Sequence, residues 1–593
     1  MKELRILLPF VRPYRWGIAA GLLLVFIAST FSILAPELIG RAIDALYAPG
    51  ITVGALLRHA APIVLVALLG GIARFFQRWL LNGISRRIEV DLRDAFFEHL
   101  VRLDAAFYGN TPTGDLMSRA TNDTVAVRQA IGPAVMYLAD TLLSTALALT
   151  FMIRISPRLT LLSLIPLVAL APITLVFGRL IHRRFEKIQD HFGRLQTMVQ
   201  ENLAGARIVR AYVRERAQER EFDALNAAYF DKNMALARIS AAFSPLLALL
   251  TGLGTVIVFW FGGTQIIAGE ITVGRFVAFT AYLARLAWPM IALGWTTNLL
   301  QRGAASMGRI HRILSIQPRI TEPAQPVRLA DVRGEIEFRN VRFRYPGTER
   351  DVLHGISFRI PAGKTVALVG PTGSGKSTIL ALMTRLYDPT EGEILLDSVP
   401  LPNLSLAQLR GAFGVVPQDA FLFSETIAEN IAFGLPPGAS AEDRIREAAS
   451  IARLDSAIAL FPQGYETRLG ERGINLSGGQ RQRTTLARAL ARDPKILILD
   501  DALSAVDTQT EAEILERLRS VLARRTAVIA SHRVTAILNA DLILVLDEGR
   551  IVERGTHAEL LARNGLYASL LRRQLIAENL DTDPELAPAR SNL

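Results

Sequence analysis

The sequence of 593 residues contains no cysteine, and few of its residues are charged. The absence of cysteine excludes disulfide bonds and thiolate metal sites, but it does not identify the compartment. Charged residues make up only 20% of the chain, whereas hydrophobic residues make up 50%. This balance argues against a chain built only from soluble domains, although its length would allow about three or four of them.

Long apolar runs occur only before residue 305. Each is near the roughly 20 residues that a helix needs to cross a bilayer. The six runs cover residues 16–40, 57–82, 130–153, 158–181, 242–267 and 275–300. We therefore expect an α-helical membrane domain with six transmembrane helices over residues 16–305. A basic elbow helix at residues 1–15, on the cytoplasmic membrane surface, is expected to precede it.

The net charge of +11 is compatible with nucleic acid binding, but the arginines gather beside the apolar runs, as they do in cytoplasmic loops of membrane proteins. Two connections, after the second and the fourth run, are basic and far longer than ordinary loops. Their helical spacing predicts that the membrane helices continue through them as rigid levers. We expect a multi-pass protein of the plasma (inner) membrane, with both termini in the cytoplasm and no nucleic acid partner.

The pattern changes after the membrane runs. Residues 306–333 form a proline-punctuated linker, after which short β-branched runs alternate with amphipathic segments. This alternation is typical of an α/β domain with a mostly parallel sheet, expected over residues 334–575 in the cytoplasm. The polar tail, 576–593, is expected to be disordered.

The motif GPTGSGKST lies between the strand-like run TVALV and an apolar helical segment. It is a P-loop in its required strand–loop–helix context, so we predict ATP and Mg²⁺ as cofactors. Lys376 would contact the β- and γ-phosphates and Ser377 would ligate Mg²⁺, while backbone amides surround the phosphates. Asp500, which ends the apolar run ILIL, would hold the Mg²⁺ shell through water. The predicted loop residues are Gly370, Pro371, Thr372, Gly373, Ser374, Gly375, Lys376, Ser377 and Thr378.

Further motifs resemble those of the ATP-binding cassette (ABC) family, and the resemblance covers essentially the whole chain. LSGGQ resembles the family signature, which in such proteins caps the γ-phosphate bound by the opposite subunit. Its residues are Leu476, Ser477, Gly478, Gly479 and Gln480. The resemblance implies the ABC exporter fold, an ATPase-coupled translocase, and a second half-transporter as partner.

The remaining family motifs are implied by the same resemblance. Tyr345 in FRYPG resembles the aromatic residue that stacks on adenine, although a strand-edge aromatic would look the same. Gln418 in VVPQD resembles the Q-loop residue, which contacts Mg²⁺ and the membrane domain. Three other segments match the D-loop, the switch histidine and an element that touches the partner's coupling helix: Asp507 in SAVD, His532 in IASHR, and GERG at 470–473.

Asp501 departs from the family pattern, because the general base at this position is normally glutamate. The side chain is shorter by one methylene, and a misplacement of about 1 Å can cost roughly 100-fold in rate. Asp501 would then bind ATP well but activate water poorly, unless a small backbone shift restores its reach. This resembles heterodimeric multidrug and peptide exporters with one impaired site. The partner's glutamate would then perform most of the hydrolysis.

Two cytoplasmic segments, 107–123 and 201–215, resemble the coupling regions of exporters, and TPTG in the first should break a helix. They could instead be solvated helix tips. Within the apolar runs, Asp140 and Arg285 are functional candidates because ionisable groups are costly there. A structural pair between helices is the alternative. Trp295 and Asn298 are further candidates for the substrate cavity.

We therefore expect an exporter of hydrophobic or amphipathic substrates (drugs, lipids or peptides) that works by alternating access in the lipid bilayer. Two alternatives remain open. One is a homodimeric lipid flippase with two slow sites. The other is an ATP-gated channel or regulatory membrane subunit, which impaired hydrolysis would favour.

Overall fold

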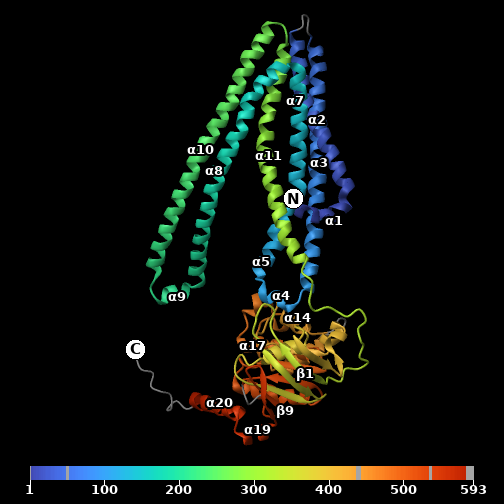
Figure 1. Cartoon of the computed structure of the whole chain (residues 1–593), viewed down its shortest axis with the longest axis vertical. Coiled ribbons are helices and arrows are strands. Elements are labelled where there is room, and N and C mark those ends of the chain that lie inside the picture. Colours follow the sequence, from blue (N-terminus) through green and yellow to red (C-terminus); the bar gives the residue numbers. More distant parts are fainter. Residues whose placement is uncertain (1, 48–51, 436–441, 533–536, 583–593) are drawn as a thin grey trace. The chain divides into compact units, whose positions relative to one another are not determined.

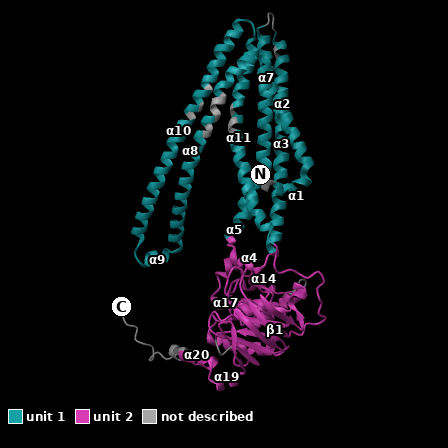
Figure 2. Ribbon diagram, in the orientation of Figure 1, with its two compact units in different colours: residues 1–101, 114–316 teal, residues 102–113, 317–593 magenta. Residues whose placement is uncertain are grey.

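The computed structural model describes residues 2–47, 52–435, 442–532 and 537–582. They divide into two compact units, coloured separately in Figure 2. The first unit contains residues 1–101 and 114–316, and the second contains residues 102–113 and 317–593. The second unit thus includes a short segment that connects two of the membrane helices.

The first unit is helical throughout its described secondary structure (Figure 1). Its helices, with π-helical segments at η3 and η4, are η1 (Lys2–Leu7), α1 (Leu8–Val11), η2 (Arg12–Tyr14), α2 (Arg15–Leu46), α3 (Val53–Arg102), α5 (Thr113–Ser118), η3 (Arg119–Asp123), α6 (Thr124–Gln129), η4 (Ala130–Ala134), α7 (Val135–Ile155), α8 (Pro157–Ala204), α9 (Ala206–Ala211), α10 (Glu215–Ile267) and α11 (Val273–Leu314).

The basic connections continue the apolar runs as single helices, as expected. Helices α3, α8 and α10 contain 50, 48 and 53 residues. At 1.5 Å per residue, each is more than twice as long as the roughly 30 Å hydrocarbon core of a bilayer. Each helix can therefore act as a lever that extends well beyond the membrane.

Four helical segments within the described residues are long and apolar enough to cross a membrane. They are Arg5–Leu46, Val53–Arg102, Thr113–Ile155 and Glu215–Ile267. The other two predicted runs, 158–181 and 275–300, lie in α8 and α11. Both helices include positions whose side chains lie outside the described part of the structure.

Helices α2, α7 and α11 pack together, whereas α8 and α10 contact mainly each other and are joined by α9 (Figure 1). Close approach of α2 and α11 depends on glycine, because a Cβ on Gly274 would lie 1.9 Å from the Gly40 carbonyl oxygen. Asp44 reinforces this contact by accepting hydrogen bonds from the Gly274 N–H at 2.7 Å and the Thr272 hydroxyl at 2.6 Å.

The second unit contains two sheets with surrounding helices. The four-stranded antiparallel sheet has the order β2-β1-β4-β5, and the six-stranded sheet has the order β10-β9-β3-β8-β7-β6. The strands are β1 (Ile336–Phe343), β2 (Leu353–Ile360), β3 (Thr365–Val369), β4 (Glu391–Leu396), β5 (Val399–Pro400), β6 (Phe413–Val416), β7 (Ile496–Asp500), β8 (Thr526–Ala530), β9 (Leu542–Asp547) and β10 (Arg550–Gly555).

The helices of the second unit follow the alternating pattern that the sequence predicts. They are α4 (Ala105–Asn110), α12 (Lys376–Met383), η5 (Leu401–Asn403), α13 (Leu406–Gly411), α14 (Ile427–Ala432), α15 (Glu442–Ile451), α16 (Asp455–Ile458), η6 (Gly464–Glu466), η7 (Glu471–Gly473), α17 (Gly478–Ala491), α18 (Thr508–Leu522), α19 (His557–Arg563) and α20 (Leu566–Thr582).

Strand alternation in the larger sheet separates two apolar cores. Along β3, Val366 and Leu368 belong to one cluster of buried side chains, and Ala367 and Val369 belong to the other. All strands of this sheet except β10 pair in parallel. The carboxyl ends of β3, β8 and β7, which are neighbours, therefore meet at one edge, where ligands of α/β sheets bind.

Two expected boundaries are wrong. Helix α11 continues to Leu314, past the domain end expected at residue 305, because Met307, Ile310 and Ile313 keep a helical spacing and are buried. Helix α20 extends to Thr582, so the start of the tail expected to be disordered (576–593) is helical. Residues 583–593 lie outside the described residues.

Candidate functional site

The P-loop connects the central strand β3 to the N-terminus of α12. Gly373 and Gly375 have φ of +82° and +102°, values that side chains with a Cβ rarely adopt. The Lys376 ammonium donates to the carbonyl oxygens of Gly370 at 2.8 Å and Pro371 at 2.9 Å. Lys376 is therefore held inside the loop, and its burial lowers the pKa of the ammonium.

Ser374 gives a direct test of whether the loop fits a phosphate group. Its side chain is only 3% exposed, and its hydroxyl oxygen has no hydrogen-bond partner among the described residues. A buried hydroxyl without a partner costs free energy, so a ligand that formed a hydrogen bond with it would be favoured. Together with the enclosed ammonium and the amides at the start of α12, this arrangement fits an anionic nucleotide.

We expect Gly370→Ala to lower both the melting temperature of the ATPase domain and its affinity for ATP. A Cβ at this position would lie 2.1 Å from the Leu546 carbonyl oxygen, and such overpacking costs about 1–3 kcal/mol. Gly373→Ala is the matched control, because φ is positive at both positions and disfavours alanine, but a Cβ on Gly373 meets nothing within 4 Å. Thermal unfolding and nucleotide binding of both variants should show the larger loss for Gly370→Ala. Equal losses would contradict the steric explanation.

Two carboxylates lie at the carboxyl end of β7. Burial raises the pKa of Asp500, and a hydrogen bond with the Ser377 side chain opposes this rise. Ser377 and Asp500 are thus brought together, as the sequence predicts for a pair around a metal ion. A hydroxyl and a carboxylate are oxygen ligands of the kind that Mg²⁺ prefers.

Asp501 adopts a left-handed backbone conformation with φ of +42°, and its side chain is 9% exposed. Its Oδ1 accepts a hydrogen bond from the His532 backbone N–H at 3.0 Å, and its Oδ2 lies 3.4 Å from Nε2 of the same histidine. Gln418 lines a small pocket of about 190 Å³ with both residues. Asp501, His532 and Gln418, which we take as the candidate catalytic residues, are therefore gathered at one place, with the Asp501 carboxylate directed toward the histidine.

Tyr345 lies beside the P-loop helix, where its hydroxyl is 3.0 Å from the Thr378 Oγ1. The ring contacts Tyr387 edge to face, with centroids 5.3 Å apart, and both rings line a pocket of about 290 Å³. Tyr387 was not among the predicted site residues. Its position just after the P-loop helix is the only signal for it in the sequence. Adenine stacking on Tyr345 remains a prediction.

The signature residues form the start of α17. Ser477 caps the helix: its hydroxyl accepts from the Gln480 N–H at 3.2 Å, and the Gln480 side chain accepts from the Ser477 N–H at 2.9 Å. Asp507 similarly caps α18 by accepting from the Thr510 N–H at 2.9 Å, a bond that lowers the pKa of Asp507. Leu476 is buried, whereas Ser477 is exposed.

The signature and the P-loop of one chain do not meet. Among the described residues, no hydrogen bond or ion pair joins residues 476–480 to residues 370–378. Gly478 and Gly479 are half-buried, and their amides, unlike those of Ser477 and Gln480, take no part in the cap, so they are available to a ligand held elsewhere. Glycine at position 479 allows the helix start to pack closely, because a Cβ there would lie 2.9 Å from the Ala505 carbonyl oxygen.

The first predicted coupling region, 107–123, breaks at Thr111 as expected, which leaves α4 as a short separate helix. Asp104 caps α4 by accepting from the Phe107 N–H at 3.2 Å, and its other oxygen accepts from the Arg319 N–H at 2.9 Å. This carboxylate thus ties α4 to the segment that follows α11, within the second unit. The second region, 201–215, forms α9 with exposed flanking residues such as Leu203 and Tyr212.

The polar candidates of the membrane runs do not pair with one another. Asp140 accepts from the Ser29 hydroxyl at 2.8 Å, whereas Arg285 donates to the Ser32 hydroxyl at 2.5 Å. Trp295 contacts Tyr137, with ring centroids 5.0 Å apart. Asn298 is exposed. Asp140 and Arg285 therefore do not pair with each other, but each bonds a serine of another helix, so the alternative of a structural role between helices stays open.

Comparison with known proteins agrees with this arrangement. A family model described as ABC transporter transmembrane region matches residues 18–290, and one described as ABC transporter matches residues 353–504. The chain is 39% identical to the probable multidrug resistance ABC transporter ATP-binding/permease protein YheI of Bacillus subtilis (strain 168), over 95% of this chain and 96% of that protein.

Other similar proteins include further exporters and a flippase. The multidrug resistance-like ATP-binding protein MdlA of Escherichia coli (strain K12) is 38% identical, over 97% of both chains. The ATP-dependent lipid A-core flippase of Syntrophus aciditrophicus (strain SB) is 37% identical, over 86% of this chain and 84% of that protein.

The solved structure of a bacterial Atm1-family ABC exporter with ATP bound superposes with a TM-score of 0.76 and 32% identity. The match covers 95% of this chain and 98% of the other. With a helical membrane domain, an α/β ATPase domain that binds ATP, and relatives matched over nearly their full lengths, the chain belongs to the ABC transporter family as an exporter half-transporter.

Proposed function

We propose that this chain is the degenerate-site half of a heterodimeric exporter, which moves hydrophobic or amphipathic substrates out of the cytoplasm by alternating access. The observation that carries this proposal is the environment of Asp501. Its short carboxylate already accepts a backbone hydrogen bond from His532, and its side chain is 9% exposed. A carboxylate held in this way is poorly placed to reach an attacking water, so the partner must supply the efficient base.

A second half-transporter follows from the separation of the signature and the P-loop. The intact signature of this chain would complete the nucleotide site of its partner, where a glutamate is expected. The P-loop of this chain would in turn receive the partner's signature. The hairpin of α8 and α10 also supports a partner, because it ends at α9 with apolar side chains exposed, including Ile208 and Val213.

Mg²⁺ fits the residues at the P-loop, where Ser377 and Asp500 would hold it and Gln418 would lie nearby. Bound there, Mg²⁺ would neutralise part of the negative charge of the phosphates. Lys376 would hold the phosphates, and Tyr345 would stack on the adenine ring. Asp501, held by His532, would activate the attacking water only weakly. Each of these residues would act at the site of this chain, and Ser477 and Asp507 at that of its partner.

Coupling between ATP hydrolysis and substrate transport would pass through α4. Its cap, Asp104, also bonds the backbone of Arg319, so movement of the ATPase domain would be transmitted to α3 and α5, which flank α4 in the chain. The positive-inside rule supports a cytoplasmic position for this helix and the ATPase domain. We propose the plasma (inner) membrane for the six spans.

ATP-dependent uptake into inside-out vesicles tests the proposal. Vesicles that contain this chain and the half-transporter that copurifies with it should accumulate a hydrophobic dye or a short-chain lipid against a gradient when ATP is added. Equilibration without accumulation would overturn export. The similarity to a lipid A-core flippase keeps a homodimeric flippase as the second candidate. Robust ATPase activity of the chain purified alone would favour that candidate.

A further inference from the structure

Two arginine side chains from different membrane runs meet at one serine. Arg74 of α3 donates through Nη2 to the Ser32 hydroxyl oxygen at 3.3 Å, and Arg285 of α11 donates through Nη1 to the same oxygen at 2.5 Å. Each guanidinium has five N–H donors, whereas the hydroxyl has two acceptor lone pairs. The single serine therefore leaves most of this donor capacity unused.

Two acidic side chains of the membrane runs, Glu37 and Asp140, bond to other groups. Glu37 is paired with Arg41 at 3.0 Å on the same helix, and Asp140 accepts from Ser29 at 2.8 Å. In the part of the chain that the structure describes, neither Arg74 nor Arg285 forms an ion pair. Two like charges that share one neutral partner repel each other, and the repulsion is strong in apolar surroundings.

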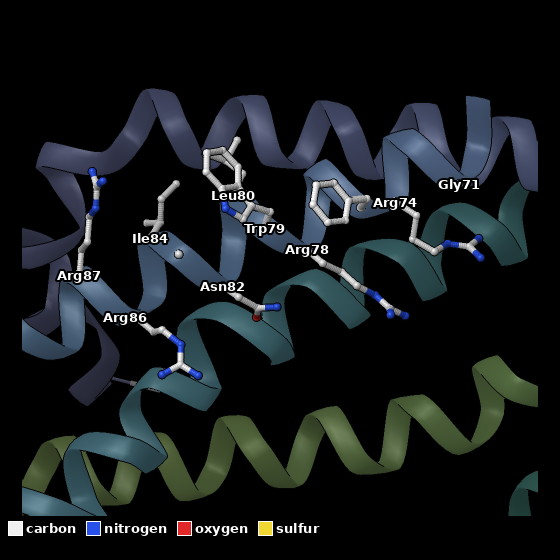
Figure 3. Close-up of a pocket in the computed structure, with 11 residues that line it drawn as sticks. Gly71, Arg74, Arg78, Trp79, Leu80, Asn82, Ile84, Arg86 and Arg87 are labelled. Atoms are coloured by element: carbon white, nitrogen blue, oxygen red, sulfur yellow. The ribbon is translucent and has the colours of Figure 1, made fainter. Parts of the chain in front are cut away.

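The surroundings of Arg74 are both open and apolar. A hollow of about 860 Å³ follows one face of α3, where Phe75 and Trp79 are 62% and 68% exposed. Figure 3 shows that Arg74, Arg78 and Arg86 project to the same side of this helix. Their spacing of four and eight residues places them on one helical face. The face thus combines a row of cations with exposed aromatic surface.

We propose that Arg74 and Arg285, with Arg78 one turn away, bind the anionic head group of a lipid-like amphiphile, whose apolar body lies against the aromatic side chains of α3. The inference rests on the proposed export function and names its substrate class. A phosphate oxyanion would accept hydrogen bonds from both guanidinium groups and remove their mutual repulsion. Ser32 holds the two arginines together.

Equilibrium binding to the assembled transporter tests this site. The probes are fluorescent short-chain phosphatidylglycerol and phosphatidylcholine with identical acyl chains, so that only the net head-group charge differs. The double variant Arg74→Gln/Arg285→Gln should weaken binding of phosphatidylglycerol at least about tenfold, because charge-assisted hydrogen bonds are lost, and should leave phosphatidylcholine binding unchanged. Both affinities are measured on the same preparation, so a difference in the folded fraction between wild type and variant affects both and does not change their ratio.

Arg58→Gln is the matched control, since Arg58 lies sixteen positions before Arg74 on the same helix and bonds the Gly54 carbonyl oxygen, and it should leave the ratio unchanged. A ratio that is the same in the double variant and the wild type would overturn the site. Displacement of the anionic probe by millimolar inorganic phosphate would also overturn it, because it would assign the arginines to a free anion instead of a lipid head group.

Transport of the same two probes separates this inference from the export function. If the affinity ratio changes in the double variant but neither probe is transported by the wild type, the anion site stands and export of these lipids fails. If the wild type transports both probes and the variant keeps the same ratio, export stands and the anion site fails.

Discussion

Replacing Ser477 by arginine is expected to reduce ATP turnover of the assembled transporter by at least about 100-fold. In the proposed heterodimer, the start of α17 completes the partner's hydrolytic site, and the loss of one oriented donor at a reacting phosphate costs about 100- to 1000-fold. Arginine would also remove the cap that Ser477 forms with Gln480 and would fill the space in front of the helix amides.

The control must lose a similar helix cap outside the signature. Ser405 caps α13 by accepting from the Gln408 N–H at 3.2 Å, the same distance as the bond from the Gln480 N–H to Ser477. Ser405→Arg should cost about 0.5–2 kcal/mol of stability, with little change in turnover once folded protein is counted. Steady-state ATPase rates of both variants distinguish a direct role of Ser477 at the nucleotide from a structural role. Equal losses would mean that Ser477 has only a structural role.

Asp501→Glu is expected to raise hydrolysis at this chain's own nucleotide site by about 100-fold. The longer side chain restores the reach that a carboxylate needs to activate water, and a misplacement of about 1 Å costs rate by this factor. The preorganised position at the end of β7 is kept, because the backbone N–H of this residue donates to the Ala530 carbonyl oxygen at 2.8 Å irrespective of the side chain.

This gain is visible only if the other site is silent. Single-turnover hydrolysis should therefore be measured in a transporter whose partner carries glutamine in place of its own general base. An unchanged rate would show that Asp501 already works as a base, and the chain would no longer be a degenerate half. Asp501→Asn in the same background is the lower reference, since it keeps the size of the side chain but cannot accept a proton.

The nucleotide site was predictable because its chemistry is local in the sequence. The P-loop glycines, Lys376 and Ser377 occur within nine consecutive residues, between a strand and a helix that the apolar pattern already indicates. Asp500 could be added because it ends an apolar strand. The strand order, which places β8 between β3 and β7, could not be read from the sequence. That order depends on how distant strands pair.

The contacts of single side chains between helices were less predictable. Asp140 and Arg285 are both conspicuous in apolar runs, yet each bonds a different serine of α2. Periodicity fixes the face on which a residue lies, but the rotation and depth of each helix depend on packing. Asp104 was missed for a related reason, since its second partner, the Arg319 backbone, lies 215 positions away in the chain.

The absence of cysteine makes the central claim directly measurable. A single cysteine at position 477 of this chain, paired with one introduced into the P-loop of the copurifying half, should form an intermolecular disulfide when ATP is bound and hydrolysis is blocked. Little cross-link should form without nucleotide. Cross-linking that is equally efficient with and without ATP, or absent in both conditions, would contradict a nucleotide clamped between two polypeptides.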